Sequence, residues 1–239
     1  MYEPARRDRP LAHPYLELGE PIDMITMRSV QPTVVAALGA HCDDIAIGAG
    51  ASLLLLCSAN PGLRVDALVL SGGGTEREYE EHGALAAFCP GADLRITVLK
   101  VPDGRLPAHW DEAKAAVEDL RGQISPDLLF APNRFYAHQD HRGLAELVPT
   151  AFRDHLILGY EIVKWDGDLG RPTAYQRLDS ALLEVKVNLL HVHYPSQRHR
   201  PWYDREAFLG LARIRGIECG ARYAEAFHIN KIALDLTGS

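Results

Sequence analysis

Two adjacent carboxylates and an imidazole interrupt the most apolar part of the sequence. The segment AHCDDIAIGAG, residues 40–50, places His41, Asp43 and Asp44 between the apolar runs VVAAL and SLLLL. One histidine nitrogen and one carboxylate oxygen can bind a catalytic metal, which leaves a second carboxylate to move a proton. Paired aspartates after a strand are also typical of a helix N-cap. Alone, the segment therefore indicates either a cap or part of a site.

A second cluster of similar chemistry occurs about a hundred residues later. The segment HQDHR, residues 138–142, contains His138, Asp140 and His141 and follows the apolar run PDLLFAP. A His-x-x-His pair alone is often a surface or core feature. Catalytic zinc sites commonly take three protein ligands and keep one position for water, so the first cluster needs a ligand from elsewhere. This second cluster can supply it.

The strands and helices expected around the two clusters predict that the clusters lie close together in the fold. Apolar runs with β-branched residues indicate strands at 33–41, 64–71, 94–101 and 126–132, and helical patterns separate them at 47–60, 76–91 and 109–124. This alternation predicts an α/β fold with a Rossmann-like, mostly parallel sheet and helices on both faces. Ligands in such sheets bind at the carboxyl ends of the strands. Both clusters are therefore expected at one edge.

The rest of the chain is less regular but continues the same fold. We expect helices at 144–154, 181–194 and 204–220 and strands at 156–165 and 226–236. Neither a repeat nor a linker divides the sequence. We therefore expect one domain over residues 1–239, with an irregular N-terminal arm at 1–31 and with C-terminal elements that cover the active-site edge.

Composition excludes several classes of protein. The net charge of −7 and the lack of a basic run argue against nucleic acid and anionic membrane as partners. No apolar stretch is long enough to span a bilayer, and the first 30 residues lack the apolar core of a signal peptide. The four cysteines are scattered without a C-x-x-C pair. A reducing cytoplasm is therefore the expected location.

The motifs together resemble a known family. AHCDDIAIGAG is similar to the A-H-P-D-D-E/I-x-x-x-G-x-G signature of the PIG-L/LmbE-like family of N-acetylglucosaminylphosphatidylinositol de-N-acetylases, and HQDHR resembles its H-x-D-H motif. Further segments similar to family segments are SGGG, R-x-x-E, PDGRL, PDLLFAP and HVHYPSQ. The resemblance covers roughly residues 34–197, and it rests mainly on the combination of the two His/Asp motifs.

The resemblance implies a metal site and a reaction. His41, Asp44 and His141 would bind a divalent metal, usually zinc, although Fe²⁺ or Co²⁺ suits the same donors. The metal-dependent reaction would hydrolyse an N-acetyl amide, most simply on an amino sugar or GlcNAc-type conjugate, and release acetate and a free amine. The expected partner is this small N-acetylated molecule. The oligomeric state stays open, a homo-oligomer included.

The resemblance also implies roles for the remaining acid–base residues. Asp43 would be the general base, and His138 would stabilise the oxyanion or act as an acid. Asp140 would orient a histidine by accepting its other N–H. Two positions depart from the family pattern, because Cys42 replaces the usual proline and Ala46 stands where relatives carry a glutamate.

The substrate cannot be read from these motifs, but candidate contacts can. Arg77, Tyr136 and Trp202 are the predicted substrate-binding residues, in loops that also include Trp165 and the segment RHRPWYD. The glycines of SGGGTER could alternatively cradle a phosphate with backbone N–H groups, although the lysine of a P-loop is missing. Competing functions are an amidase acting on a non-sugar metabolite or thiol conjugate, and a non-catalytic metal-binding module.

Overall fold

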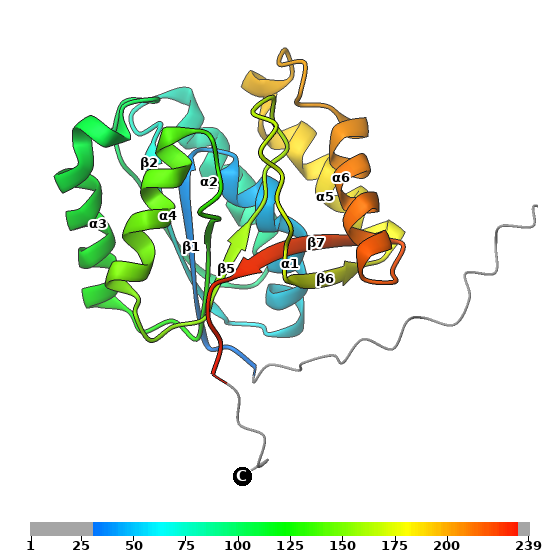
Figure 1. Ribbon diagram of the computed structural model, residues 1–239, viewed down its shortest axis with the longest axis horizontal. Coiled ribbons are helices and arrows are strands. Elements are labelled where there is room, and N and C mark those ends of the chain that lie inside the picture. Colours follow the sequence, from blue (N-terminus) through cyan, green and yellow to red (C-terminus); the bar gives the residue numbers. More distant parts are fainter. Residues whose placement is uncertain (1–30, 234–239) are drawn as a thin grey trace, which may run out of the picture.

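A seven-stranded sheet runs through the computed structural model, which describes residues 31–233 (Figure 1). The strands are, in chain order, β1 (Val34–His41), β2 (Arg64–Ser71), β3 (Asp93–Val98), β4 (Leu128–Pro132), β5 (Ile157–Tyr160), β6 (Ala174–Leu178) and β7 (Tyr223–Ile229). The predicted N-terminal arm falls almost entirely on residues 1–30, outside the described residues. Its structure and the single-domain boundaries at 1–239 stay predictions.

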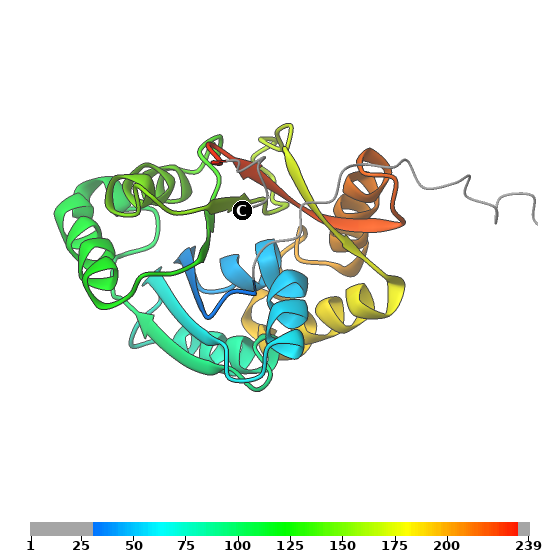
Figure 2. The same ribbon diagram turned by 90° about the horizontal axis from the view of Figure 1, so that it is seen from below.

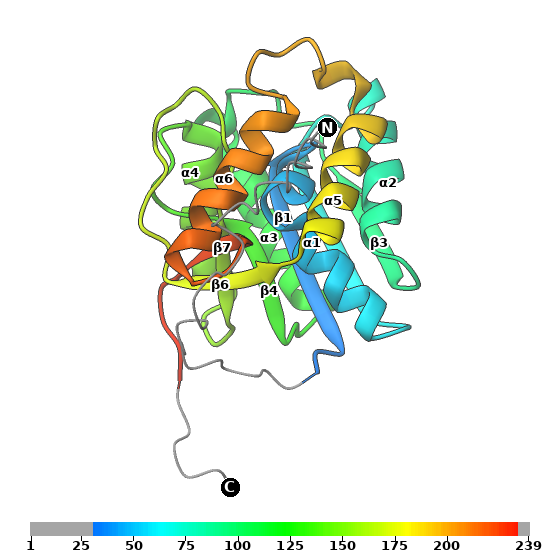
Figure 3. The ribbon, with the colours of Figure 1, turned by 90° about the vertical axis from the view of Figure 1, so that its right-hand side faces the viewer.

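Helices cover both faces of this sheet (Figure 2). They are α1 (Asp44–Ala59), α2 (Glu76–Phe88), α3 (Trp110–Gln123), α4 (Gln139–Ala151), α5 (Ser180–His193) and α6 (Arg205–Glu218), with the short 3₁₀ helices η1 (Leu106–His109) and η2 (Pro195–Gln197). One hydrophobic core joins the sheet to α1, α2, α5 and α6, and a second joins its other face to α3 and α4. Figure 3 shows α5 and α6 alongside α1.

The strand order places the functional edge. The order is β3-β2-β1-β4-β5-β7-β6, with β3 to β5 parallel and β7 antiparallel to both β5 and β6. From β1 the chain continues to β2 and β3 on one side of the sheet, and it then crosses to β4, which lies on the other side of β1. The carboxyl ends of β1 and β4 thus flank a topological switch point, where open α/β sheets bind ligands.

Two glycines of helix α1 allow close packing against other elements. A Cβ atom at Gly48 would lie 2.3 Å from Cδ2 of Tyr160 in β5, and one at Gly50 would lie 2.7 Å from Cε1 of Phe88 in α2. The Tyr160 hydroxyl in turn donates a 2.7 Å hydrogen bond to the carbonyl of Leu38 in β1. Gly48 therefore lets α1 pack on Tyr160, which also binds the strand that carries the first motif.

The fold class predicted from the sequence is confirmed, and the differences are local. Helix α4 begins at Gln139 rather than at residue 144, so the second cluster includes the first turn of a helix. The final strand begins at Tyr223, and the short antiparallel strand β6 was not predicted because AYQRL carries no clear alternation. Among residues 31–233, no helix is long and apolar enough to cross a membrane.

The close packing at Gly48 leads to a test of the fold. We expect Gly48→Ala to lower the free energy of unfolding by about 1–3 kcal/mol, because the new methyl group overlaps the Tyr160 ring. Gly122→Ala is the matched control, since no heavy atom lies within 4 Å of its Cβ position in α3. That change should raise stability by up to about 1 kcal/mol. Equal effects in urea unfolding would contradict the packing described for α1.

Candidate active site

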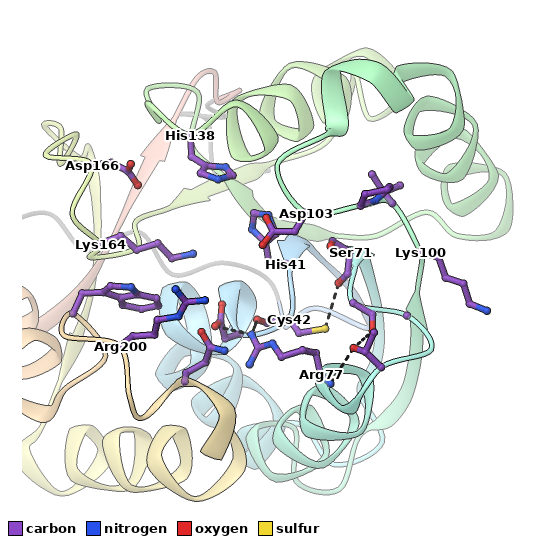
Figure 4. A pocket seen from close by; sticks show the side chains of 18 of the residues that line it. His41, Cys42, Ser71, Arg77, Lys100, Asp103, His138, Lys164, Asp166 and Arg200 are labelled. Carbon is purple, nitrogen blue, oxygen red and sulfur yellow. Dashed lines mark hydrogen bonds and ion pairs between the residues drawn. The ribbon is translucent and has the colours of Figure 1, made fainter.

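A cavity of about 590 Å³ opens at the carboxyl ends of the central strands (Figure 4). Its floor comes from the ends of β1 and β2 and from the segment after β3. His138, the segment between β5 and β6, and the segment between α5 and α6 complete the wall. The cavity therefore lies at the edge where both sequence motifs were expected.

Three potential metal ligands meet beside this cavity. Nδ1 of His41 lies 3.1 Å from Nε2 of His141, and Oδ2 of Asp44 lies 3.1 Å from the same Nε2 and 3.5 Å from Nδ1 of His41. Ligands at zinc bond lengths in a tetrahedron are separated by about 3.3 Å. The three donor atoms thus have the spacing of one face of a zinc tetrahedron, and the chemistry of a His₂Asp site.

The other nitrogen of His41 is held by a carboxylate. Nε2 lies 3.1 Å from Oδ2 of Asp140, which also accepts from the N–H of Gly104 at 2.7 Å. The second oxygen of Asp140 accepts from the N–H of Leu106 at 3.1 Å. A hydrogen on Nε2 directed to Asp140 would leave Nδ1 free to bind a metal beside Asp44 and His141. This arrangement is typical of metal-binding histidines.

Asp103 approaches the same nitrogen from the solvent side. Its Oδ1 lies 3.0 Å from Nε2 of His41, and this hydrogen bond is the main cause that lowers the pKa of Asp103 to about 2. With His41 and His138 it forms a second group of potential ligands within 4.8 Å. We favour the first group because Asp44 and His141 are almost fully buried, whereas the Asp103 side chain is 78% exposed.

The two adjacent aspartates face different partners because of the backbone between β1 and α1. Asp43 has φ of 101°, the only positive φ outside glycine among residues 31–233. Its side chain makes no capping hydrogen bond to α1, although it occupies the N-cap position. One carboxylate oxygen accepts a 2.8 Å bond from Arg77 instead, while the other is buried without a partner among the described residues. The cap interpretation is therefore wrong for this side chain.

A buried glutamate binds the backbone of this turn. Glu81 is fully buried in α2, and its Oε2 accepts from the N–H of Asp43 at 2.8 Å and from the Tyr194 hydroxyl at 2.7 Å. Burial raises the pKa of Glu81 to about 8. The strained backbone of Asp43 is thus fixed by a side chain from another helix, itself fixed by a tyrosine that follows α5.

The pKa values of the two aspartates shift in opposite directions, although the same kinds of charge surround them. Burial raises the pKa of Asp43, and Lys164 and Arg77 oppose this rise. Against burial, His141 and Lys164 hold the pKa of Asp44 well below its usual range. Lys164 lies 3.3 Å from Oδ1 of Asp44, while Oδ2 lies on the side of the histidines. The structure therefore distinguishes Asp44, with a lowered pKa, from Asp43, with a raised pKa.

His138 directs one nitrogen into the cavity. As the N-cap of α4 it accepts from the N–H of Asp140 on Nδ1 at 3.3 Å, so its hydrogen is on Nε2. Burial lowers its pKa, and the neighbouring His141 and His41 lower it further. The ring is therefore a neutral N–H donor about 5 Å from the rings of both histidines.

The predicted substrate-binding residues separate into two groups. Arg77 and Trp202 line the cavity, although Arg77 is largely engaged by Asp43, Glu80 and Ser196. Tyr136 does not line it. Its side chain is buried, its hydroxyl donates to the carbonyl of Tyr160 at 3.1 Å, and its ring packs edge-on against His141. We therefore place Tyr136 behind the site as a support for His141 rather than at the substrate.

Two other sequence features have structural explanations. Cys42 points away from the ligand cluster, and its thiol donates to the carbonyl of Ser71 at 3.4 Å. The N–H groups of Gly73 and Gly74 are occupied by Leu99 and Glu78, respectively. The glycine segment after β2 therefore shapes the cavity wall and leaves few donors for a phosphate cradle.

Several site residues were not identified from the sequence. Glu81 and Lys164 lie among ordinary charged residues of a helix and a loop. The turn at Asp103 and Gly104 was expected at the edge of the substrate pocket, and Asp103 does line the cavity, but its contact with His41 was not predicted. Nothing in the spacing of Lys164 relates it to Asp44, from which it is separated by 120 residues.

Comparison with known proteins finds a family match. Residues 36–152 match the family model PIG-L, described as GlcNAc-PI de-N-acetylase. The uncharacterized deacetylase YaiS of Escherichia coli (strain K12) is 29% identical over 172 residues, which cover 66% of this chain and 89% of YaiS. Both findings agree with the PIG-L/LmbE-like resemblance of the two motifs. Enzymes that remove N-acetyl groups are hydrolases of amide bonds.

Solved structures share the fold. The N,N'-diacetylchitobiose deacetylase from Pyrococcus horikoshii superposes with a TM-score of 0.63 and 22% identity over 83% of this chain and 84% of its own. GalB, the 4-carboxy-2-hydroxymuconate hydratase from Pseudomonas putida KT2440, superposes with a TM-score of 0.66 and 14% identity over 87% and 100%. The same fold therefore occurs in a deacetylase and in a hydratase. The reaction of this protein must be inferred from the residues of its site and not from the fold.

The buried Glu81 leads to a prediction about pH. Because its folded pKa of about 8 exceeds the ordinary 4.5, the folded protein binds a proton there more tightly than the unfolded chain does. The free energy of unfolding should fall as pH rises from about 4.5 to about 8, by at most about 1.4 kcal/mol per pH unit. Glu81→Gln should remove this contribution, and chemical unfolding across that pH range measures it.

The control is Glu118→Gln, which removes a carboxyl group from the exposed face of α3 and should leave the pH dependence unchanged. Identical slopes for the wild type and Glu81→Gln would show that Glu81 does not hold a proton in the folded protein.

Proposed function

We propose that this protein is a metal-dependent N-deacetylase of the GlcNAc-PI de-N-acetylase family. It would hydrolyse the N-acetyl group of a small molecule, most simply an amino sugar or its conjugate, and release acetate and a free amine. The observation that carries this proposal is the pairing of a zinc-like donor set with a separate buried carboxylate, Asp43, one residue from a proposed ligand. A module that only binds metal has no need for that second carboxylate.

Three residues would hold the metal. His41, Asp44 and His141 supply two imidazole nitrogens and one carboxylate oxygen, and zinc is the best match to this set, with Fe²⁺ and Co²⁺ as alternatives. A metal bound there would polarise the amide carbonyl and bring the pKa of a water molecule near neutrality. Asp140 keeps His41 in the required tautomer, and Lys164 keeps one oxygen of Asp44 away from the metal side.

Asp43 would move the proton. Its unpartnered oxygen is available to accept a proton from the attacking water, while Arg77 holds the other oxygen. Burial raises the pKa of this carboxylate and so favours proton uptake, while Lys164 and Arg77 oppose that rise and favour proton release. The same proton can then pass to the leaving nitrogen, which an amide requires because a free amide anion is a poor leaving group. Asp43 thus serves as base and then as acid.

His138 would stabilise the oxygen of the amide as it becomes negative. Its neutral ring presents Nε2–H toward the cavity, because Nδ1 accepts from the backbone of Asp140. A donor that is already oriented needs no reorganisation when charge develops. The role of Asp140 is indirect, because both of its oxygens are occupied by His41 and by backbone N–H groups.

The size and lining of the cavity support a small polar substrate. About 590 Å³ accommodates a mono- or disaccharide conjugate, and indole and polar side chains line the wall together. The diacetylchitobiose deacetylase of the same fold acts on such a sugar. An amide that carries no sugar is the alternative. Acetate release from N-acetylhexosamine conjugates distinguishes the two, and absence of acetate from all of them would exclude the sugar substrate.

Asp43→Asn tests the proposed chemistry. Asparagine has nearly the same shape and tolerates a positive φ, so the turn should persist. We expect zinc content equal to that of the wild type and a kcat for acetate release about 10²- to 10⁴-fold lower, because the amide cannot accept the proton. Metal analysis and an acetate assay on the same preparation measure both quantities.

His141→Ala is the companion variant and should lose both metal and activity. A non-catalytic metal-binding module predicts a different outcome, in which Asp43→Asn changes nothing measurable. Unaltered turnover in Asp43→Asn would therefore remove Asp43 from the mechanism.

A further inference from the structure

Two cations from different segments reach into the same part of the cavity. Lys164 comes from the segment between β5 and β6, and Arg200 comes from the segment between η2 and α6. Figure 4 shows both side chains extending into the cavity from the wall opposite Asp103. Trp202 lies beside them, with Nζ of Lys164 5.2 Å from its ring centroid. Neither cation belongs to the proposed set of metal ligands.

Arg200 has no counter-ion within the described part of the chain. Among residues 31–233, no carboxylate lies within 4 Å of its guanidinium, and no described acceptor takes a hydrogen bond from its side chain. Asp166 also lines the cavity but forms no ion pair with either cation. An arginine that points into a cavity with five free donors is suited to an anionic oxygen group.

The charge balance of the cavity is opposite to that of the protein. The chain carries a net charge of −7, yet the cavity is lined by Arg77, Lys100, Lys164 and Arg200 against Asp43, Asp103 and Asp166. Arg77 is neutralised by Asp43, and Lys100 points away from His41 (Figure 4). A divalent metal at the proposed site would add further positive charge. Arg200 is thus the cation that remains for a ligand, beside Lys164, whose Nζ already lies 3.3 Å from Oδ1 of Asp44.

The segment that carries Lys164 is firmly held. At its start, Glu161 accepts two bonds from Arg215 at 2.7 and 2.8 Å, and Arg215 also donates to the carbonyl of Gly170 at 3.1 Å. Asp168 accepts from the N–H of Ala137 at 2.7 Å, beside His138. The position of Lys164 over the cavity is therefore built into the fold.

We propose that Lys164, Arg200 and Trp202 form a subsite for an anionic group, a phosphate or a carboxylate, on the part of the substrate remote from its N-acetyl group. This inference rests on the proposed deacetylase function and narrows its substrate class to charged conjugates. Lys164 and Arg200 bind the anionic oxygens, and the Trp202 indole packs against the adjoining sugar ring or chain. A neutral amino sugar would leave Arg200 without a partner.

Product binding tests the subsite without any turnover. Zinc-loaded protein is titrated calorimetrically with glucosamine 1-phosphate and with methyl glucosaminide, and the wild type should bind the phosphate more tightly by about tenfold or more. Arg200→Gln should remove most of this preference, and Arg200→Lys should retain part of it because it keeps the charge. Lys114→Gln on α3 is the control, since it removes one exposed positive charge far from the cavity.

Turnover of matched N-acetylated compounds tests the same subsite independently. The compounds are N-acetylglucosamine 1-phosphate, the carboxymethyl glycoside of N-acetylglucosamine and its methyl glycoside, so the first two separate phosphate from carboxylate. At least one charged compound should have a kcat/KM about tenfold above the methyl glycoside. This ratio should fall toward one in Arg200→Gln and stay unchanged in Lys114→Gln.

The outcomes separate this inference from the function on which it rests. Equal binding and equal kcat/KM for charged and neutral compounds would overturn the subsite and leave the deacetylase intact. Phosphate preference that survives in Arg200→Gln would also overturn it, because the anion would then bind elsewhere, such as at the metal. Arg200-dependent binding of glucosamine 1-phosphate without acetate release from any compound would support the subsite and contradict the proposed deacetylation of amino-sugar conjugates.

Discussion

The backbone at Asp43 is the constraint on which the proposed site depends. Asp43 and Asp44 are adjacent in sequence, but their carboxylates contact different partners. A positive φ, which costs roughly 1–3 kcal/mol for a residue with a side chain, turns Asp43 toward Arg77 while Asp44 faces His41 and His141. Glu81 and Arg77 offset this cost by binding the N–H and the carboxylate of Asp43. The strain therefore falls on the residue for which we propose the proton transfer.

Sheet topology brings the remaining groups to this turn. β1 and β4 are neighbours although α1, β2, α2, β3 and α3 separate them in sequence, and His41 and His141 are 100 residues apart. The β1 turn supplies one nitrogen, one oxygen and the free carboxylate, while the start of α4 supplies the other nitrogen. Asp140 links the two halves, because it follows β4 and yet binds the nitrogen of His41 that faces away from Asp44. Each motif alone is incomplete, and the strand order makes them one site.

Much of this arrangement follows from the sequence, and the limits have physical causes. The alternation of buried strands and helices predicts the parallel sheet, and the rule for its carboxyl edge places the two His/Asp clusters together, while the ligand set His41, Asp44 and His141 came from the family resemblance. Tyr136 was expected at the substrate because it lies in a motif loop, but its position two residues before His138 directs the ring inward beneath His141. Glu81 and Lys164 escaped notice because their contacts join segments that share no local pattern, and Arg200 was expected only as part of the loop segment RHRPWYD. Cavity lining is decided by such tertiary contacts, so the residues of the proposed anion subsite could be grouped only from the structure.

The central claim is that three protein atoms form one face of a tetrahedral metal site whose geometry the fold sets in advance. Anomalous diffraction at the zinc absorption edge, from crystals grown with zinc, tests this claim directly. The account predicts one strong peak about 2.0–2.2 Å from Nδ1 of His41, Oδ2 of Asp44 and Nε2 of His141, with Asp43 outside bonding distance. A peak bound by Asp43, or one centred between Asp103 and His138, would contradict the division of roles between the two aspartates.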